Sequence, residues 1–192
     1  MLYRLSKKAR FVTVQLNLHS NQPLFVTCLH LNHKTEPKRL KEINAIRKHL
    51  DKVFKEDHCQ IWTGDFNAVT KEDYSDEKWQ NITAVRKRNC WELPKTELTA
   101  KVDKFEFKQI FGEFCNIFIF QVKSFGFKDS WHLTGCPEPI KTCRFETHID
   151  YVYANDKFLS KYKVQEVVHV DDTASDHNMV MATFVIKQEV LE

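Results

Sequence analysis

Residues 59–67, CQIWTGDFN, join a run of strand-forming residues directly to the sequence Gly-Asp-Phe-Asn. β-Branched and aromatic residues gather in 59–65, so these residues predict a β-strand. The following Gly-Asp-x-Asn predicts a turn, because Asp and Asn side chains hydrogen-bond to their own backbone. A carboxylate and a carboxamide are therefore expected at the end of a strand, where functional side chains collect on layered sheet scaffolds.

The segments on either side predict strands and helices in a mixed order. Upstream, residues 11–18 and 24–31 flank the turn-forming HSNQP and predict an antiparallel hairpin. Residues 36–55 predict an amphipathic helix with Pro37 near its start. Downstream, a helical stretch is predicted at 76–90, and strands at 148–154, 163–170 and 178–186. This order indicates an α+β layered domain, and 192 residues suit one domain.

Residues 102–121, VDKFEFKQIFGEFCNIFIFQ, follow neither the helical nor the strand period. Two interpretations stay open. The segment is a buried strand with a loop, or it is an insertion such as a translated intron, to which no function should be assigned. An exposed run this apolar would be an aggregation liability.

Composition excludes several classes of protein. The net charge of +3 does not indicate a general nucleic-acid binder, although a local basic surface is compatible with it. None of the six cysteines lies in a Cys-x-x-Cys pair, and Cys136 and Cys143 lack a matching second pair, which argues against a zinc site. The chain has no apolar run of about 18 residues and no secretory signal at its start. We expect an intracellular protein, cytoplasmic or nuclear, that is a monomer with reduced thiols.

Four short motifs stand at predicted strand ends in a defined order: TCLHL at 27–31, GDFN at 64–67, THIDYV at 147–152 and SDHN at 175–178. Taken singly, a strand-end His, an Asp-Asn turn and a Ser-Asp helix cap are all ordinary structural features. Asp150 is less easily explained, because a carboxylate among apolar strand residues needs a partner to offset its desolvation.

Taken together, the motifs match the needs of phosphodiester hydrolysis. That reaction requires a hard cation held by carboxylate oxygens, a group that orients or deprotonates the attacking water, and donors that stabilise charge on phosphoryl oxygens. Asp, Asn and His side chains supply these three functions.

In this order, the motifs resemble the endonuclease/exonuclease/phosphatase, or DNase I-like, superfamily from about residue 11 to the C-terminus. The stretch CRFETHIDYVYA at 143–154 is also similar to the tyrosyl-DNA phosphodiesterase group. The resemblance implies a four-layer α/β/β/α sandwich and a Mg²⁺- or Mn²⁺-dependent hydrolase of phosphoesters, most often of nucleic acid. The substrate itself stays open, since fold alone does not settle function.

The resemblance also implies roles for individual residues. His30 would contact the scissile phosphate, and Asn67 would hydrogen-bond a phosphoryl oxygen. Asp65 would position or activate the attacking water, while Asp176 would bind the metal directly or through water.

The remaining implied pair is a carboxylate–histidine dyad. His177 would be the general base or a phosphate clamp, and Asp150 would fix its tautomer and orientation. Two neighbours are weaker candidates: Arg144, which suits a solvated surface, and His148, which shares a strand face with Asp150 if the strand period holds.

One departure from the family concerns the N-terminal side. Family members open with a strand carrying an Asn and a second strand carrying a metal-binding Glu, whereas only 26 residues precede Thr27 and the first glutamate is Glu36. We therefore expect a sandwich incomplete at its N-terminus. A truncated gene model, a catalytically inactive phosphate- or nucleic-acid-binding paralogue, and completion by another chain are the alternatives.

Overall fold

The computed structural model describes residues 2–4, 11–17, 23–54, 58–91, 117–136, 139, 141–171 and 173–188. A six-stranded sheet has the order β1-β2-β3-β4-β6-β5, and β7 and β8 pair in a second sheet. The strands of the first sheet are β1 (Leu2–Arg4), β2 (Phe11–Asn17), β3 (Pro23–His30), β4 (Cys59–Asp65), β5 (Phe127–Asp129) and β6 (Asp150–Asn155). Those of the second are β7 (Tyr162–Val170) and β8 (Met179–Ile186).

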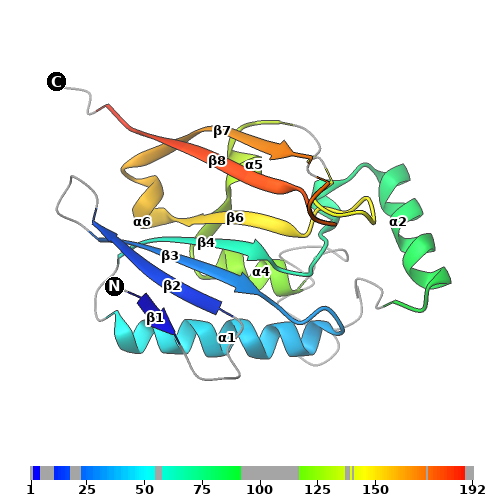
Figure 1. Ribbon diagram of the computed structural model, residues 1–192, viewed down its shortest axis with the longest axis horizontal. Helices are drawn as coiled ribbons and strands as arrows, with labels where there is room; N and C mark the ends of the chain where they lie inside the picture. Colours follow the sequence, from blue (N-terminus) through cyan, green and yellow to red (C-terminus); the bar gives the residue numbers. More distant parts are fainter. Residues whose placement is uncertain are drawn as a thin grey trace, which may run out of the picture.

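Helices lie beside and at the end of this sandwich (Figure 1). They are α1 (Glu36–Val53), the 3-10 turn η1 (Lys71–Asp73), α2 (Asp76–Arg88), α4 (Ile117–Ser124), α5 (Ser130–Leu133) and α6 (Asp156–Leu159). The predicted helices at 36–55 and 76–90 are confirmed with slightly earlier ends. Among the described helices, none has the length and apolarity that a membrane crossing demands.

The predicted hairpin is confirmed, with β2 and β3 antiparallel. Helix α1 is the crossover between β3 and β4, which run parallel. Strand β6 then pairs antiparallel with β4 on its other side. These three strands, β3, β4 and β6, are consequently neighbours, although β6 is far away in the sequence.

The six-stranded sheet buries apolar side chains on both faces. On one face, Ile43, Ile46 and Leu50 of α1 pack in a core with Trp62 of β4, because their spacing of three and four places them on one side of the helix. On the other face, strand residues such as Ile61 pack with partly buried residues of β8. Figure 1 shows α1 and the β7–β8 sheet on opposite sides of the large sheet, which is the α/β/β part of the predicted four-layer α/β/β/α sandwich.

The segment 102–121 is only partly described. Residues 117–121 form the start of α4, so the strand interpretation is wrong for them. Val122 in this helix is fully buried, and Gln121 Nε2 donates to Asn44 Oδ1 of α1 at 3.1 Å. Helix α4 therefore packs on the domain through Val122 and contacts α1 through Gln121, while residues 102–116 lie outside the described residues.

Candidate active site

Strand register brings three predicted site residues together at one end of the large sheet. His30 is the Cα partner of Asp65 across β3 and β4, and Asp65 is the Cα partner of Asp150 across β4 and β6. The Nε2 atom of His30 lies 3.5 Å from Oδ2 of Asp65. Because side chains of directly opposed residues project from the same face, three motifs far apart in sequence become one polar cluster.

The glycine of the GDFN motif has a packing role. Gly64 has φ +120°, and a Cβ built on it would lie 2.2 Å from the carbonyl oxygen of Leu29. No larger residue fits there without moving the backbone of β3 or β4. Gly64 therefore permits the close approach of the two strands that carry His30 and Asp65.

Asn67 stabilises the turn that follows β4. Its backbone has φ 50°, and its N–H donates to Asp65 Oδ1 at 2.7 Å. Its side-chain Nδ2 donates to Asp65 Oδ2 at 2.8 Å and to the carbonyl oxygen of Leu31 at 3.0 Å. The carboxamide thus holds the Asp65 carboxylate in place, and contact with a phosphoryl oxygen would require it to release one of these acceptors.

His177 and Asp150 form the predicted pair. Nδ1 of His177 lies 2.9 Å from Oδ2 of Asp150. Because an ionised carboxylate only accepts hydrogen bonds, Nδ1 carries the hydrogen and Nε2 is the nitrogen that can take up a proton. The arrangement is that of a general base oriented by a carboxylate.

The pKa values of His177 and Asp65 are both raised in this cluster. For His177, burial lowers the pKa, but the hydrogen bond to Asp150 and the charges of Asp150, Asp65 and Asp176 outweigh it, so the pKa is raised. For Asp65, burial and the charge of Asp150 raise the pKa, and the Asn67 N–H and the two nearby His side chains offset this only in part.

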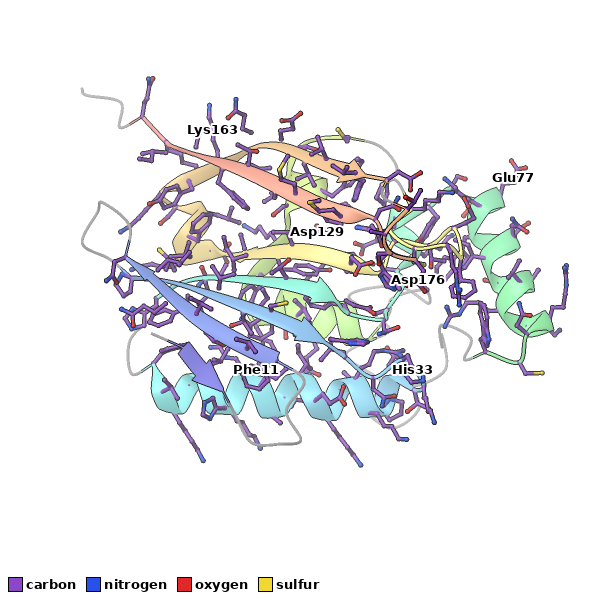
Figure 2. All side chains as sticks on the ribbon, viewed as in Figure 1. Phe11, His33, Glu77, Asp129, Lys163 and Asp176 are labelled. Atoms are coloured by element: carbon purple, nitrogen blue, oxygen red, sulfur yellow. The ribbon has the colours of Figure 1, made fainter. Side chains whose placement is uncertain are left out.

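Asp176 lies at the same end of the sandwich, but its carboxylate contacts Arg144 and is not part of the Asp65–Asp150–His177 cluster. Its Oδ2 is 3.7 Å from Nε of Arg144, and its carbonyl oxygen accepts the Arg144 N–H at 3.0 Å. Figure 2 shows Asp176 at the end that faces α2. The donor atoms that lie within 4.8 Å of one another belong to Asp65, Asp150 and His177.

Thr142, which no sequence motif indicated, supports both halves of the dyad. Its Oγ1 accepts the N–H of Ile149 at 2.9 Å and of Asp150 at 3.1 Å. Its carbonyl oxygen accepts the N–H of Asn178, the residue after His177, at 2.9 Å. Thr142 is fully buried, and its hydroxyl and its carbonyl oxygen together fix the start of the Asp150 strand relative to the loop of His177.

His148 does not join this cluster. The strand period does not apply to it, because β6 begins at Asp150 and residues 147–149 form a loop. Its side chain is buried and its Nδ1 lies 3.2 Å from Asp73 Oδ2 in the interior. Because residues 147–149 are not in the strand, His148 points into the interior, whereas Asp150 lies in the candidate site.

A cleft of about 880 Å³ opens beside the cluster, between α2 and the loop before β6, and both Asn67 and His177 line it. Trp91 and Phe145 face each other there edge to face, with ring centroids 4.9 Å apart. The Arg144 guanidinium carbon lies 4.7 Å from the Phe145 ring centroid. Arg144, predicted to be a surface residue, is exposed but also lines this cleft.

Several solved structures share this fold. An AP endonuclease from Archaeoglobus fulgidus matches with a TM-score of 0.56 and 14% identity, over 91% of this chain and 65% of that one. An endonuclease/exonuclease/phosphatase family protein from Leptotrichia buccalis C-1013-b matches with 0.54 and 14%, over 91% and 53%. The catalytic domain of human Nocturnin matches with 0.53 and 14%, over 92% and 52%.

These similarities confirm the predicted fold, which is that of the endonuclease/exonuclease/phosphatase proteins. The chain spans 52% to 65% of the length of the three chains just named. No protein-family model matches the sequence, and no curated protein matches it either. The finer resemblance to tyrosyl-DNA phosphodiesterases stays a prediction.

Proposed function

We propose that this chain, with its endonuclease/exonuclease/phosphatase fold, carries the catalytic centre of a metal-dependent phosphoesterase that hydrolyses phosphodiester bonds in nucleic acid. One observation carries the proposal. The Asp150–His177 pair, with 2.9 Å between Oδ2 and Nδ1, stands next to Asp65 in a single cluster at the sheet end. A base, its orienting carboxylate and a second carboxylate are thereby within reach of one water molecule.

In the proposed reaction, His177 Nε2 takes a proton from the water whose oxygen attacks phosphorus. The P–O bond to the leaving group breaks, its electron pair goes to the leaving oxygen, and that oxygen is protonated from His177 or solvent. Asp150 holds the imidazole in the required tautomer and stabilises its charged form. Asp65 positions the attacking water. A general base of this kind contributes about 10²–10⁴ in rate.

Charge on the phosphoryl oxygens needs donors, and two predicted residues supply them. His30 is about two-thirds exposed and lies 3.5 Å from Asp65, so its ring can reach a substrate phosphate. Asn67 offers its carboxamide once a phosphate competes for one of its present bonds. Such positioned donors stabilise a phosphoryl transition state electrostatically.

The donor set suits a divalent cation in part. The carboxylates of Asp65 and Asp150 repel each other, which contributes to the raised pKa of Asp65, and a nearby cation would relieve this repulsion. Mg²⁺ and Mn²⁺ favour such oxygen ligands. Asp65 and Asp150 would hold the ion, and Asp176, the predicted ligand, would join them only if its carboxylate turned away from Arg144. When bound, it would polarise a phosphoryl oxygen.

The cleft supports nucleic acid as the substrate. Lys34 and Arg144 line it with positive charge, and Trp91 and Phe145 offer aromatic surface next to His177. Aromatic side chains stack with bases regardless of sequence, and Arg and Lys contact phosphates. A nucleic acid therefore suits this cleft, because its phosphates match the positive side chains and its bases match the aromatic ones.

The test is hydrolysis of labelled single-stranded and duplex oligonucleotides in the presence of Mg²⁺, Mn²⁺ or EDTA. We expect metal-dependent cleavage that Asp65→Ala and His177→Ala abolish without unfolding the protein. Asp51→Ala, on the exposed side of α1 and paired with Arg47, is the control and should retain activity. Retained cleavage in the first two variants would contradict the assignment. Oligonucleotide binding without any cleavage by the unmodified protein would identify a catalytically inactive binding module instead.

A further inference from the structure

The interior of the sandwich holds a second cluster of ionisable side chains, separate from the candidate active site. Asp73 ends η1, Asp129 ends β5 and His148 precedes β6, and they are 1%, 4% and 1% exposed. One ligand atom from each lies within 4.8 Å of the other two. Figure 2 shows Asp129 in the middle of the molecule and Asp176 toward the end that faces α2.

Asp73 is well supplied with hydrogen bonds. Its Oδ1 lies 3.0 Å from Nε2 of His132, and its Oδ2 accepts the Tyr151 hydroxyl at 2.9 Å and lies 3.2 Å from Nδ1 of His148. These contacts orient its carboxylate toward the cluster. They resemble the outer hydrogen bonds that hold a metal-binding carboxylate in place.

Asp129 is less well satisfied. Its Oδ1 accepts the N–H of Trp131 at 3.0 Å, but its buried Oδ2 has no hydrogen-bond partner among the described residues. A buried carboxylate oxygen without a partner is costly, because it has lost its water and gained nothing in return. This atom belongs to the residue that completes the three-residue cluster.

A further imidazole lies nearby on the second sheet, outside the group of donor atoms that lie within 4.8 Å of one another, so its ring would have to move to reach a shared ion. His169 of β7 has its ring centroid 5.6 Å from that of His148. Both of its ring nitrogens are buried and have no hydrogen-bond partner within the described part of the chain. Imidazole nitrogens buried without partners are rare unless a ligand or water satisfies them.

We propose that this cluster binds one Zn²⁺ ion, held by Asp73, Asp129 and His148, with His169 as the fourth ligand from the opposite sheet. Two carboxylates match the double charge of the ion, which removes the cost of burying both. A set that mixes carboxylate oxygen with imidazole nitrogen suits zinc, and four ligands are its usual number in closed structural sites.

The site would be structural and not catalytic. Its three central residues are almost inaccessible to solvent, so no substrate phosphate can reach the ion. The ion would join η1, β5 and the start of β6 to β7, and so would hold the two sheets of the sandwich together. It differs from the proposed active-site ion, whose proposed protein ligands are all carboxylate oxygens.

The experiment measures metal retention and needs no catalysis, so its failure is distinct from failure of the proposed phosphoesterase function. Protein with the background substitutions Asp65→Asn and His177→Gln, which remove active-site donors, is stripped with chelator, loaded with ZnCl₂ and desalted. We expect one equivalent of zinc by elemental analysis and a higher melting temperature. Co²⁺ should give the visible spectrum of a tetrahedral site.

In the same background, Asp129→Asn should lose the bound zinc. His169→Phe, at a half-buried position that tolerates an aromatic ring, should weaken zinc retention by about tenfold or more if His169 is a ligand. Asp51→Asn is the matched control and should keep the full equivalent. Absence of zinc from the background protein would overturn the proposal, leaving a cluster held by hydrogen bonds. The proposal would also be overturned if Asp129→Asn and His169→Phe both retained as much zinc as the background protein.

Discussion

Nδ1 of His177 lies 2.9 Å from Oδ2 of Asp150, although the two residues are 27 positions apart in the chain. The carboxylate raises the pKa of the imidazole against the opposing effect of burial. It thereby sets both the orientation of the candidate base and the pH range in which that base is neutral.

Replacement of Asp150 by Asn should lower the pKa of His177. In the folded protein this pKa is raised, so the pair stabilises the fold fully below the ordinary His pKa and loses this contribution as pH rises through the folded value. The acid limb of the rate profile should move to lower pH, with a rate loss of about 10²–10⁴. NMR titration of the His177 ring measures the pKa directly. Asp176→Asn, which removes a more distant charge, should produce a smaller decrease, and equal decreases would contradict the pairing.

Thr142→Val should disturb the dyad, whereas Thr142→Ser should not. Valine has the shape of threonine but cannot accept the N–H groups of Ile149 and Asp150, which are partly buried. A fully buried donor left unpaired costs about 1–3 kcal/mol, so the loss here should be at the lower end of that range. We expect a lower free energy of unfolding and a shifted pKa of His177 for the valine variant. Urea denaturation and the NMR titration check both. A valine variant that is destabilised but keeps the His177 pKa would limit Thr142 to a structural role.

Gly64→Ala should be strongly destabilising. The added Cβ would lie 2.2 Å from the Leu29 carbonyl oxygen, and the φ of +120° is itself unfavourable for alanine. Backbone strain alone costs about 1–3 kcal/mol, and the clash adds to it. Gly135→Ala is the matched control, since φ is +73° but nothing lies within 4 Å of the added Cβ. Similar denaturation midpoints for the two variants would show that the close approach of β3 and β4 is unimportant.

Substitutions of Asn67 separate its backbone role from its side-chain role. Glycine accepts φ 50° readily, whereas alanine in this region is strained by about 1–2 kcal/mol. Both lack the carboxamide that contacts Asp65 and Leu31. Asn67→Gly should therefore be more stable than Asn67→Ala in thermal melts, and both should lose about 10²–10³ in rate. Full activity of the glycine variant would exclude a catalytic role for the side chain.

Phe145→Ala should weaken oligonucleotide binding. Phe145 pairs with Trp91 and lies under Arg144 in the cleft, and base–aromatic stacking is worth about 1–3 kcal/mol per base. The dissociation constant, measured by fluorescence anisotropy, should rise about tenfold or more. Leu133→Ala, another exposed apolar residue that does not line this cleft, is the control. An unchanged dissociation constant for Phe145→Ala would place nucleic acid elsewhere.

The sequence was sufficient for the main elements and for four of the side chains that meet in the candidate site, namely His30, Asp65, Asp150 and His177. Residues 59–65 form β4 as predicted, and Glu36–Val53 form the predicted amphipathic helix. These elements are set by local periodicity and by turn-forming residues, which short stretches of sequence contain in full. The four motifs, in their order, resemble one superfamily, and that resemblance implied both the fold and the Asp150–His177 pair.

Other features depended on contacts between distant segments. His148 and Asp150 belong to different clusters because β6 begins only at Asp150. Residues 117–121 are helical, although their sequence pattern favoured neither a helix nor a strand. Strand register, and not the spacing of motifs, places His30, Asp65 and Asp150 side by side. The supporting role of Thr142 could be recognised only from its hydrogen bonds in the structure. A local pattern states which faces are apolar, but which side chains meet depends on how strands pair and where each begins, and these are properties of the packed chain as a whole.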